Sequence, residues 1–156
     1  MKHLAFAILM GTLLISACNQ KDACEDVNCN NGVCVSGDCL CDSGYEGLNC
    51  EIEQRSAFVA DYNVSESCDL GDFTYVINVA ADSENGTELT IHNLGDFDFD
   101  VAATVNGTSF IISDQTGNGA TVNGTGTLTN GILTITYTME TTGGQTLNCT
   151  MTCTPL

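Results

Sequence analysis

The sequence predicts a mainly β protein in which a small disulfide-rich module precedes an antiparallel meander of about eight strands. Six of the ten cysteines lie between Cys24 and Cys50, a density typical of a disulfide scaffold. Beyond residue 57, apolar and polar residues alternate with a period of two, as they do in strands with one buried face. Asn-Gly pairs separate these runs, and Asn-Gly is the strongest short-range signal of a hairpin.

An export signal is expected over residues 1–17. Lys2 precedes the apolar run LAFAILMGTLLI, and the small residues Ser16 and Ala17 close it. A transmembrane helix needs about 20 apolar residues, which is longer than this run. We therefore expect the segment to direct export and not to span a membrane.

Cys18 stands directly after this segment, apart from the other cysteines. The order Ile15, Ser16, Ala17, Cys18 resembles the lipobox of bacterial lipoproteins. The resemblance implies that the Cys18 thiol carries a diacylglycerol; the alternative is an ordinary cleaved signal with Cys18 in a disulfide. Residues 18–23 would form a lipidated tether, whose NQKDA string is similar to the surface-export signal of Bacteroidota lipoproteins. The expected location is the outer membrane, lipid-anchored and exposed on the cell surface.

The composition is strongly acidic. Removal of residues 1–17 leaves two basic side chains against 20 acidic ones, a formal charge of −18. Such a field repels nucleic acid, so no nucleic-acid partner is expected. Because 43% of the residues are apolar and alternate regularly, the chain can bury enough surface to fold despite its charge. Ten cysteines behind an export signal indicate an oxidising location.

The clustered cysteines follow the spacing of a known module. The stretch CLCDSGYEGLNC has the Cys-x-Cys-x-x-Gly-aromatic-x-Gly-x-x-Cys ending of EGF-like domains, and CNNGVC matches their Asn-Gly turn. Spacing alone leaves many pairings open. Residues 24–50 resemble an EGF-like domain, and that resemblance implies the pairs Cys24–Cys34, Cys29–Cys39 and Cys41–Cys50.

Two metal-binding alternatives apply to this module. Zinc is the other common use of clustered cysteines, but an oxidising location favours disulfides. Calcium-binding EGF-like domains carry an acidic lead before their first cysteine, where this chain has QKDA. We therefore expect solvated acids and no metal here.

Residues 58–156 form the second expected domain, after a linker at 51–57. Strands are expected near 58–68, 73–81, 87–94, 97–105, 108–113, 120–128, 132–140 and 145–153. Tight turns are expected at Asn85–Gly86, Asn106–Gly107 and Asn130–Gly131. Asn123–Gly124 is either a turn or part of a strand thinned by Gly124 and Gly126. Such a meander closes most simply into an up-and-down barrel or a flattened sandwich.

The same stretch resembles a family of small β domains at the C-terminus of secreted Bacteroidota proteins. Its marks are Y-x-V-x-E-x-C in the first strand at 62–68, an A-x-V-N-G hairpin at 103–107 and Cys149 in the final strand. A lipocalin-like barrel is the shape we expect.

Three cysteines belong to this domain. Cys149 and Cys153 lie four apart on one expected strand, so about 13 Å separates their Cα atoms, too far for a disulfide. If the first and last strands are antiparallel neighbours, the end of the first meets the start of the last, which favours Cys68–Cys149. Cys153 is then an odd thiol, expected to be a small buried apolar residue because it shares a face with Met151.

The sequence offers little for catalysis. The mature chain has a single histidine, His92, expected on the surface, and no H-E-x-x-H, G-x-S-x-G or phosphate-cradling loop occurs. We therefore expect no enzyme activity, no catalytic residue and no cofactor. Asp96, Asp98 and Asp100 are expected as a stripe on one strand face, either a weak calcium site or, more simply, a solvated face.

One acid is expected inside the second domain. Alternation between Tyr62 and Cys68 places Glu66 on the inner face. A buried acid needs a partner, so Glu66 either bonds to a neighbour or marks a polar spot in a ligand cavity. Glu66, Tyr75 and Tyr137 are the candidate cavity residues.

Two functions of different classes follow. The first is a non-enzymatic surface lipoprotein: the membrane is its partner through Cys18, and the EGF-like spacer presents the β domain to a surface protein or to matrix. The second is a lipocalin-like carrier that encloses a small apolar ligand near Glu66. An enzyme would have to use acids alone or Cys153, and it is the least supported reading.

Overall fold

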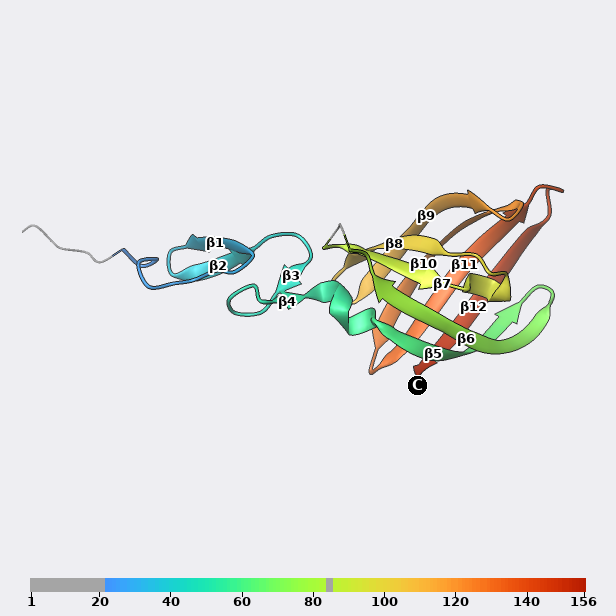
Figure 1. Ribbon diagram of the computed structural model, residues 1–156, viewed down its shortest axis with the longest axis horizontal. Coiled ribbons are helices and arrows are strands. Elements are labelled where there is room, and N and C mark those ends of the chain that lie inside the picture. Colours follow the sequence, from blue (N-terminus) through green and yellow to red (C-terminus); the bar gives the residue numbers. More distant parts are fainter. Residues whose placement is uncertain (1–21, 84–85) are drawn as a thin grey trace, which may run out of the picture.

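The computed structural model describes residues 22–83 and 86–156. The export signal, Cys18 and Asn85 of the expected Asn85–Gly86 turn lie outside these ranges. Figure 1 shows a narrow N-terminal module of short strands, followed along the long axis by a barrel. The predicted class, mainly β with a disulfide-rich module before an antiparallel barrel, is confirmed.

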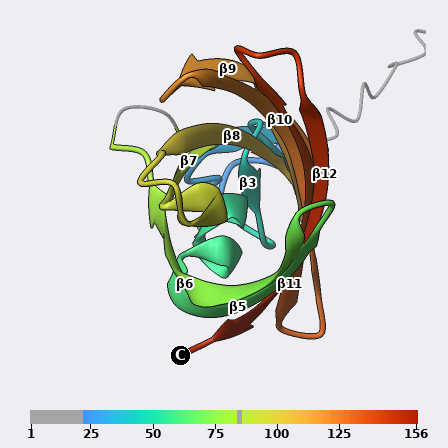
Figure 2. The same cartoon turned by 90° about the vertical axis from the view of Figure 1, so that its right-hand side faces the viewer.

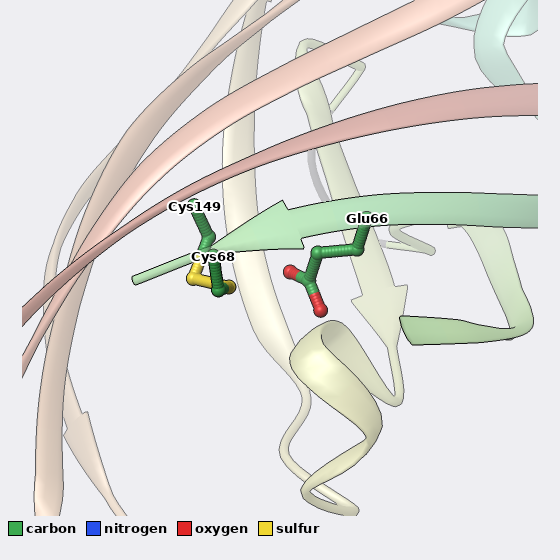
Figure 3. A group of neighbouring side chains, drawn as sticks. All are labelled: Glu66, Cys68 and Cys149. Atoms are coloured by element: carbon green, nitrogen blue, oxygen red, sulfur yellow. A yellow bond between two sulfur atoms is a disulfide. The ribbon is translucent and has the colours of Figure 1, made fainter. Parts of the chain in front are cut away.

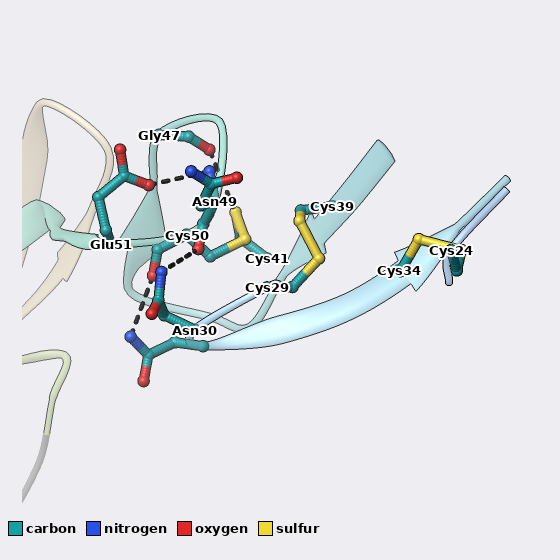
Figure 4. Close-up of a disulfide and its surroundings, with 11 residues drawn as sticks. Cys24, Cys29, Asn30, Cys34, Cys39, Cys41, Gly47, Asn49, Cys50 and Glu51 are labelled. Carbon is teal, nitrogen blue, oxygen red and sulfur yellow. Dashed lines mark hydrogen bonds between the residues drawn. A yellow bond between two sulfur atoms is a disulfide. The ribbon is translucent and has the colours of Figure 1, made fainter. Parts of the chain in front are cut away.

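The N-terminal module consists of two small antiparallel sheets. β1 (Gly32–Val35) pairs with β2 (Asp38–Cys41), and β3 (Tyr45–Glu46) pairs with β4 (Ile52–Glu53). So little paired backbone buries almost no core, and three disulfides distributed along the module hold it together instead (Figure 4). They join Cys24 to Cys34, Cys29 to Cys39 and Cys41 to Cys50, the pairs that the EGF-like resemblance implies.

Asparagine side chains fasten the end of this module. The amides of Asn30 and Asn31 donate to the carbonyl oxygens of Asn49 and Cys50, at 2.9 and 3.0 Å (Figure 4). Cys50 is fully buried, so its bridge forms the small interior of the module. The loop that contains Cys50 therefore folds back onto the start of β1.

Eight strands form a closed barrel in which every neighbouring pair is antiparallel. They are β5 (Ala60–Cys68), β6 (Gly71–Ala81), β7 (Glu88–His92), β8 (Val101–Asn106), β9 (Ser109–Gly117), β10 (Ala120–Thr129), β11 (Ile132–Thr141) and β12 (Thr146–Pro155). Chain neighbours pair in order, and β12 returns to pair with β5. No long sheet edge is left open among these strands.

The period-two pattern separates the inside of the barrel from its outside. In β11, Leu133, Ile135 and Tyr137 are buried, while the threonines between them face outward. Inward side chains of all eight strands join one apolar cluster. The barrel interior is therefore filled by side chains over most of its length.

The turn at Asn130–Gly131 is the expected two-residue hairpin. Thr129 pairs with Ile132, and both turn residues have positive φ, 51° and 80°. Such a turn matches the twist of the flanking strands. Asn118–Gly119 makes the same kind of turn. β9 therefore continues to Gly117, whereas the corresponding expected strand ended at 113.

Asn123–Gly124 is not a turn, because β10 continues through it with an irregularity between Val122 and Gly124. A Cβ atom on Gly126 would lie 2.1 Å from the Phe110 ring. The glycine therefore makes room for a buried aromatic ring, which confirms the thinned-strand interpretation.

The expected strand at 97–105 is wrong over its first four residues. A short 3-10 helix, η2 (Leu94–Asp96), and an irregular segment precede β8, and Asp96 and Asp98 have left-handed φ of 59° and 52°. The Asn118 amide donates to the carbonyl oxygens of Phe97 and Asp98, where a strand would have ladder bonds. The three aspartates therefore do not form a stripe on a strand face.

The expected linker at 51–57 is a folded junction. It contains β4 and most of the 3-10 helix η1 (Gln54–Phe58), so the first barrel strand begins at Ala60 and not at 58. Phe58 is fully buried, and its ring contacts that of Phe110 with centroids 5.5 Å apart. η1 thus closes the barrel end nearest the EGF-like module, called the proximal end below.

The other end, called the distal end, lies farthest from the N-terminal module. η2, the β5–β6 turn and the β11–β12 loop lie there (Figure 1), and η2 crosses the opening in the end-on view of Figure 2. None of the helices in the described ranges has the length and apolar character needed to cross a membrane.

Candidate functional site

Glu66 is a carboxylate inside the barrel. The alternation of β5 turns its side chain inward after Tyr62 and Val64, and only 3% of its surface remains exposed. Tyr137 on β11 reaches the same place, and its hydroxyl donates to Glu66 Oε1 at 2.6 Å. The short distance is typical of an O–H donor on a charged acceptor.

Tyr75 on β6 completes this polar cluster. Its hydroxyl is buried beside the same carboxylate, but it lacks a hydrogen bond of acceptable geometry to any described residue. Burial, together with the charge of Glu66, raises the pKa of both Tyr75 and Tyr137 well above the ordinary tyrosine value. Both phenols therefore stay neutral across the physiological range. Glu66, Tyr75 and Tyr137 thus lie together inside the barrel, but of these three candidate cavity residues only Glu66 lines the distal pocket described below.

No basic side chain of the described ranges faces this carboxylate. Arg55 pairs with Glu53 at 2.9 Å at the proximal end, and His92 Nδ1 lies 2.8 Å from Asp100 on the outer surface. Arg55 thus lies at the other end of the barrel, and the His92 side chain lies on its outside. A carboxylate so deeply buried is normally paired with a cation, so the arrangement around Glu66 is unusual.

A pocket of about 190 Å³ opens at the distal end, with Glu66 at its base. Met139, Leu147 and the Cys68–Cys149 pair supply apolar walls, and Gly95 and Asp96 of η2 form one side. The rim is apolar and exposed: Leu70 is 60% exposed, Phe97 49% and Phe73 45%.

Gly95 allows η2 to lie close to the polar cluster. Its φ is 71°, and a Cβ atom there would lie 2.7 Å from the Phe97 ring and 2.8 Å from the Tyr137 hydroxyl. Any larger residue would push η2 away from the barrel opening. This glycine therefore sets the shape of the pocket.

The cluster of Glu66, Cys68 and Cys149 has the residue types of a metal site but not the chemistry. Figure 3 shows the Glu66 carboxylate beside the two sulfur atoms. The sulfurs are joined to each other in a disulfide, so neither is a thiolate ligand. This bridge is the pair favoured by the antiparallel arrangement of the first and last strands, and Cys149 lies directly opposite Cys68 in the register.

Cys153 is the one free cysteine of the described ranges, and it is buried. Burial, and secondarily the charge of Glu66, raises the pKa of its thiol to about 12. A thiol so rarely ionised is a poor nucleophile, which agrees with a structural role.

A larger hollow, of about 430 Å³, lies elsewhere, on the outer face of β5, β6 and β12. Small polar side chains such as Ser65, Thr74 and Thr152 line it. Of the polar cluster only Tyr75 borders this hollow, whereas the buried carboxylate of Glu66 lines the smaller distal pocket, which is therefore the better candidate site.

Sequence reasoning missed the residues that surround Glu66 at the pocket. Leu70 lies in the β5–β6 turn, Phe73 follows that turn on β6, and Phe97 lies in the segment expected to be a strand. A feature of the sequence could have indicated them: large apolar residues stand beside turn residues, where polar side chains are usual. Cys18, the expected lipidation site, lies outside the described residues.

Comparison with known proteins identifies the N-terminal module. Residues 24–53 match the family model of the teneurin-like EGF domain. No curated protein matches the chain. Among solved structures, the crystal structure of zebrafish ileal bile acid-binding protein complexed with cholic acid is similar at 16% identity and a TM-score of 0.40, over 64% of this chain and 99% of that one. Residues 24–53 thus form an EGF-like domain, on the combined evidence of cysteine spacing, disulfide pairs and family model.

Proposed function

We propose that this chain is a non-enzymatic surface lipoprotein, anchored in the outer membrane through lipid on Cys18. In this proposal the EGF-like domain is a spacer that presents the barrel to a protein or matrix partner. The observation that carries the proposal is the placement of the ends: the EGF-like domain lies between the N-terminal side and the barrel, and the distal end faces away from it (Figure 1). An anchor at Cys18 would direct that end outward.

The junction between the two domains supports the role of a spacer. Arg55 donates to the carbonyl oxygens of Asp82 and Glu88, and the Gln54 side chain accepts from the backbone N–H of Gly107 at 3.0 Å. Gln54 also donates its own N–H to Gly44 of the EGF-like domain. A bonded junction transmits the orientation of the spacer to the barrel, as a flexible linker would not.

The side chains available for chemistry support the non-enzymatic part of the proposal. Cys153 is buried with a raised pKa, and His92 lies on the surface beside Asp100. Neither is placed as a nucleophile or as a general base beside one.

The experiment uses intact cells that express the full chain. Metabolic labelling with a fatty acid should mark the wild-type protein and not a Cys18→Ala variant. Protease added outside the cells should digest the barrel, while a periplasmic control protein stays intact. Failure of the fatty acid to label the protein would overturn the anchor, and protection of the barrel from protease would overturn surface exposure.

A second candidate function is supported by the distal pocket. Because side chains fill most of the barrel, a carrier of this shape would hold its ligand at the distal end and not along the barrel axis. The pocket is smaller than the roughly 300–1,000 Å³ of most ligand sites. It would therefore take a small molecule or a single side chain, and binding of small probes by the purified chain tests this.

A further inference from the structure

We propose that the distal pocket binds a primary ammonium group carried on an apolar stem, with Glu66 as the anion that receives it. The inference rests on the second candidate function and specifies the ligand class. The charge of the pocket is negative. Glu66 lies at the base and Asp96 at the side, and the described ion pairs of Arg55 and His92 are made with Glu53 and Asp100, not with either of these carboxylates.

The Glu66 carboxylate is buried and has no cationic partner among the described ion pairs. A carboxylate removed from water is costly unless it is paired, and Tyr137 supplies one neutral donor to one oxygen. A cation that enters the pocket would supply the missing charge. An anion would meet two carboxylates and is excluded by repulsion.

The remaining surface of the pocket indicates the rest of the ligand. Met139 and Leu147 offer apolar walls, and the exposed rings of Phe73 and Phe97 stand at the rim. Aromatic faces attract ammonium groups as well as apolar bodies. A volume of about 190 Å³ is slightly larger than the roughly 150 Å³ cavity that takes a benzene molecule. The ligand is therefore about as large as a single aromatic ring with its amine.

This chemistry is offered both by free amines and by lysine side chains of proteins, and the test separates these sources. The purified full-length mature chain, labelled at methionine methyl groups, is titrated with benzylamine, benzyl alcohol, benzoate and a short peptide with one lysine. Met139 lines the pocket, so its methyl signal reports binding there, and Met151 is fully buried opposite Glu66 in the β12–β5 register, so its signal reports changes beside the carboxylate.

Benzylamine should shift the Met139 signal, while benzoate should not. The variant Glu66→Gln should weaken benzylamine binding about tenfold or more, as expected for loss of a charged hydrogen bond. Glu140→Gln removes the same charge from an exposed site on the barrel and should leave affinity unchanged. Peptide binding that matches benzylamine would assign the site to a partner's lysine, and weaker peptide binding would assign it to a free amine.

Asp96→Asn is a second variant that tests the proposal if Glu66→Gln does not fold. Asp96 is exposed with a φ of 59°, and asparagine tolerates that left-handed backbone, so the fold should be kept and affinity should fall a few-fold. If benzyl alcohol or benzoate binds as tightly as benzylamine, the cation proposal is overturned while the carrier function stands. If no probe shifts Met139, both fail.

Discussion

The Tyr137 hydroxyl donates to the Glu66 carboxylate across the barrel interior, and the two residues are 71 positions apart in the sequence. They sit on β11 and β5, which are separated by β12 in the closed barrel. The bond therefore depends on closure of the barrel by the last strand. It also connects fold stability to the distal pocket, because the same carboxylate lies at the base of that pocket.

Replacement of Tyr137 by phenylalanine should destabilise the barrel by about 1–3 kcal/mol, because a buried carboxylate loses its donor. Denaturant unfolding, followed by tyrosine fluorescence, measures the change in the free energy of unfolding. Tyr45→Phe is the matched control, since Tyr45 lies in the EGF-like domain outside the barrel core. Equal effects of the two variants would contradict a stabilising role for the Glu66 bond.

Stability should also fall in alkaline solution. The pKa values of Tyr62, Tyr75 and Tyr137 are raised in the folded state, mainly by burial, and that of Cys153 is raised from 9.0 to about 12. The unfolded chain thus loses these protons at lower pH than the folded chain. The contribution of these groups is fully present below about pH 9 and is lost above it, by up to about 1.4 kcal/mol per pH unit for each group.

Unfolding midpoints at about pH 8 and about pH 11 measure this loss, and tyrosinate absorbance measures the ionisation itself. Tyr75 and Tyr137 should ionise only when the barrel unfolds, and Tyr62 should ionise above the ordinary tyrosine value. If they titrate near their ordinary value while the barrel stays folded, the interior is open to solvent and the prediction fails.

The sequence could predict which side chains point into the barrel, because successive residues of a strand point to opposite faces. A period of two assigns Glu66, Tyr75 and Tyr137 to the inner face whatever the partner strands are. The Cys68–Cys149 pair follows from the same pattern plus the neighbouring first and last strands, and the register places these two residues opposite each other.

The pocket could not be predicted, because its walls depend on the segment at 94–100. The run DFDFD alternates as a strand does, but hydrogen bonds from Asn118, a distant residue, hold Phe97 and Asp98 in an irregular path. The junction was missed for a similar reason. Arg55 donates to backbone carbonyl oxygens 27 and 33 positions away. Every residue has a backbone carbonyl, so the residue types do not show which ones Arg55 contacts.

Cys153 should resist alkylation in the folded protein. With a pKa of about 12, a fraction on the order of 10⁻⁵ of the thiol is ionised at neutral pH, and the side chain is buried. A Cys18→Ser variant leaves Cys153 as the thiol to be counted by mass after treatment with iodoacetamide. We expect no label under native conditions and one label per chain after denaturation; native labelling would show that Cys153 is accessible.

Removal of the Cys68–Cys149 disulfide by paired alanine substitution should destabilise the barrel by about 2–4 kcal/mol. The bridge closes a loop of 81 residues in the unfolded chain, which is where most of its effect arises in the chain-entropy account. Paired substitution of Cys29 and Cys39 is the control, since their bridge lies in the EGF-like domain. The barrel unfolding midpoint should fall for the first pair and stay unchanged for the second.

Arg55→Met should loosen the EGF-like domain from the barrel. The methionine keeps an apolar stem, but the carbonyl oxygens of Asp82 and Glu88 lose a charged donor, worth about 1.5–3 kcal/mol for each such bond. NMR relaxation of backbone amides measures whether the two domains tumble together. We expect one correlation time in the wild type and two in the variant.

Arg55→Lys is the matched control for this junction, because it keeps the charge without the planar fork that reaches two carbonyl oxygens. It should give an intermediate separation of the two correlation times. If the two domains of the Arg55→Met variant still tumble with one correlation time, contacts such as Gln54 to Gly107 and the burial of Phe58 suffice to hold the junction. Arg55 would then orient the EGF-like domain only in part, and the spacer proposal would depend on η1 instead.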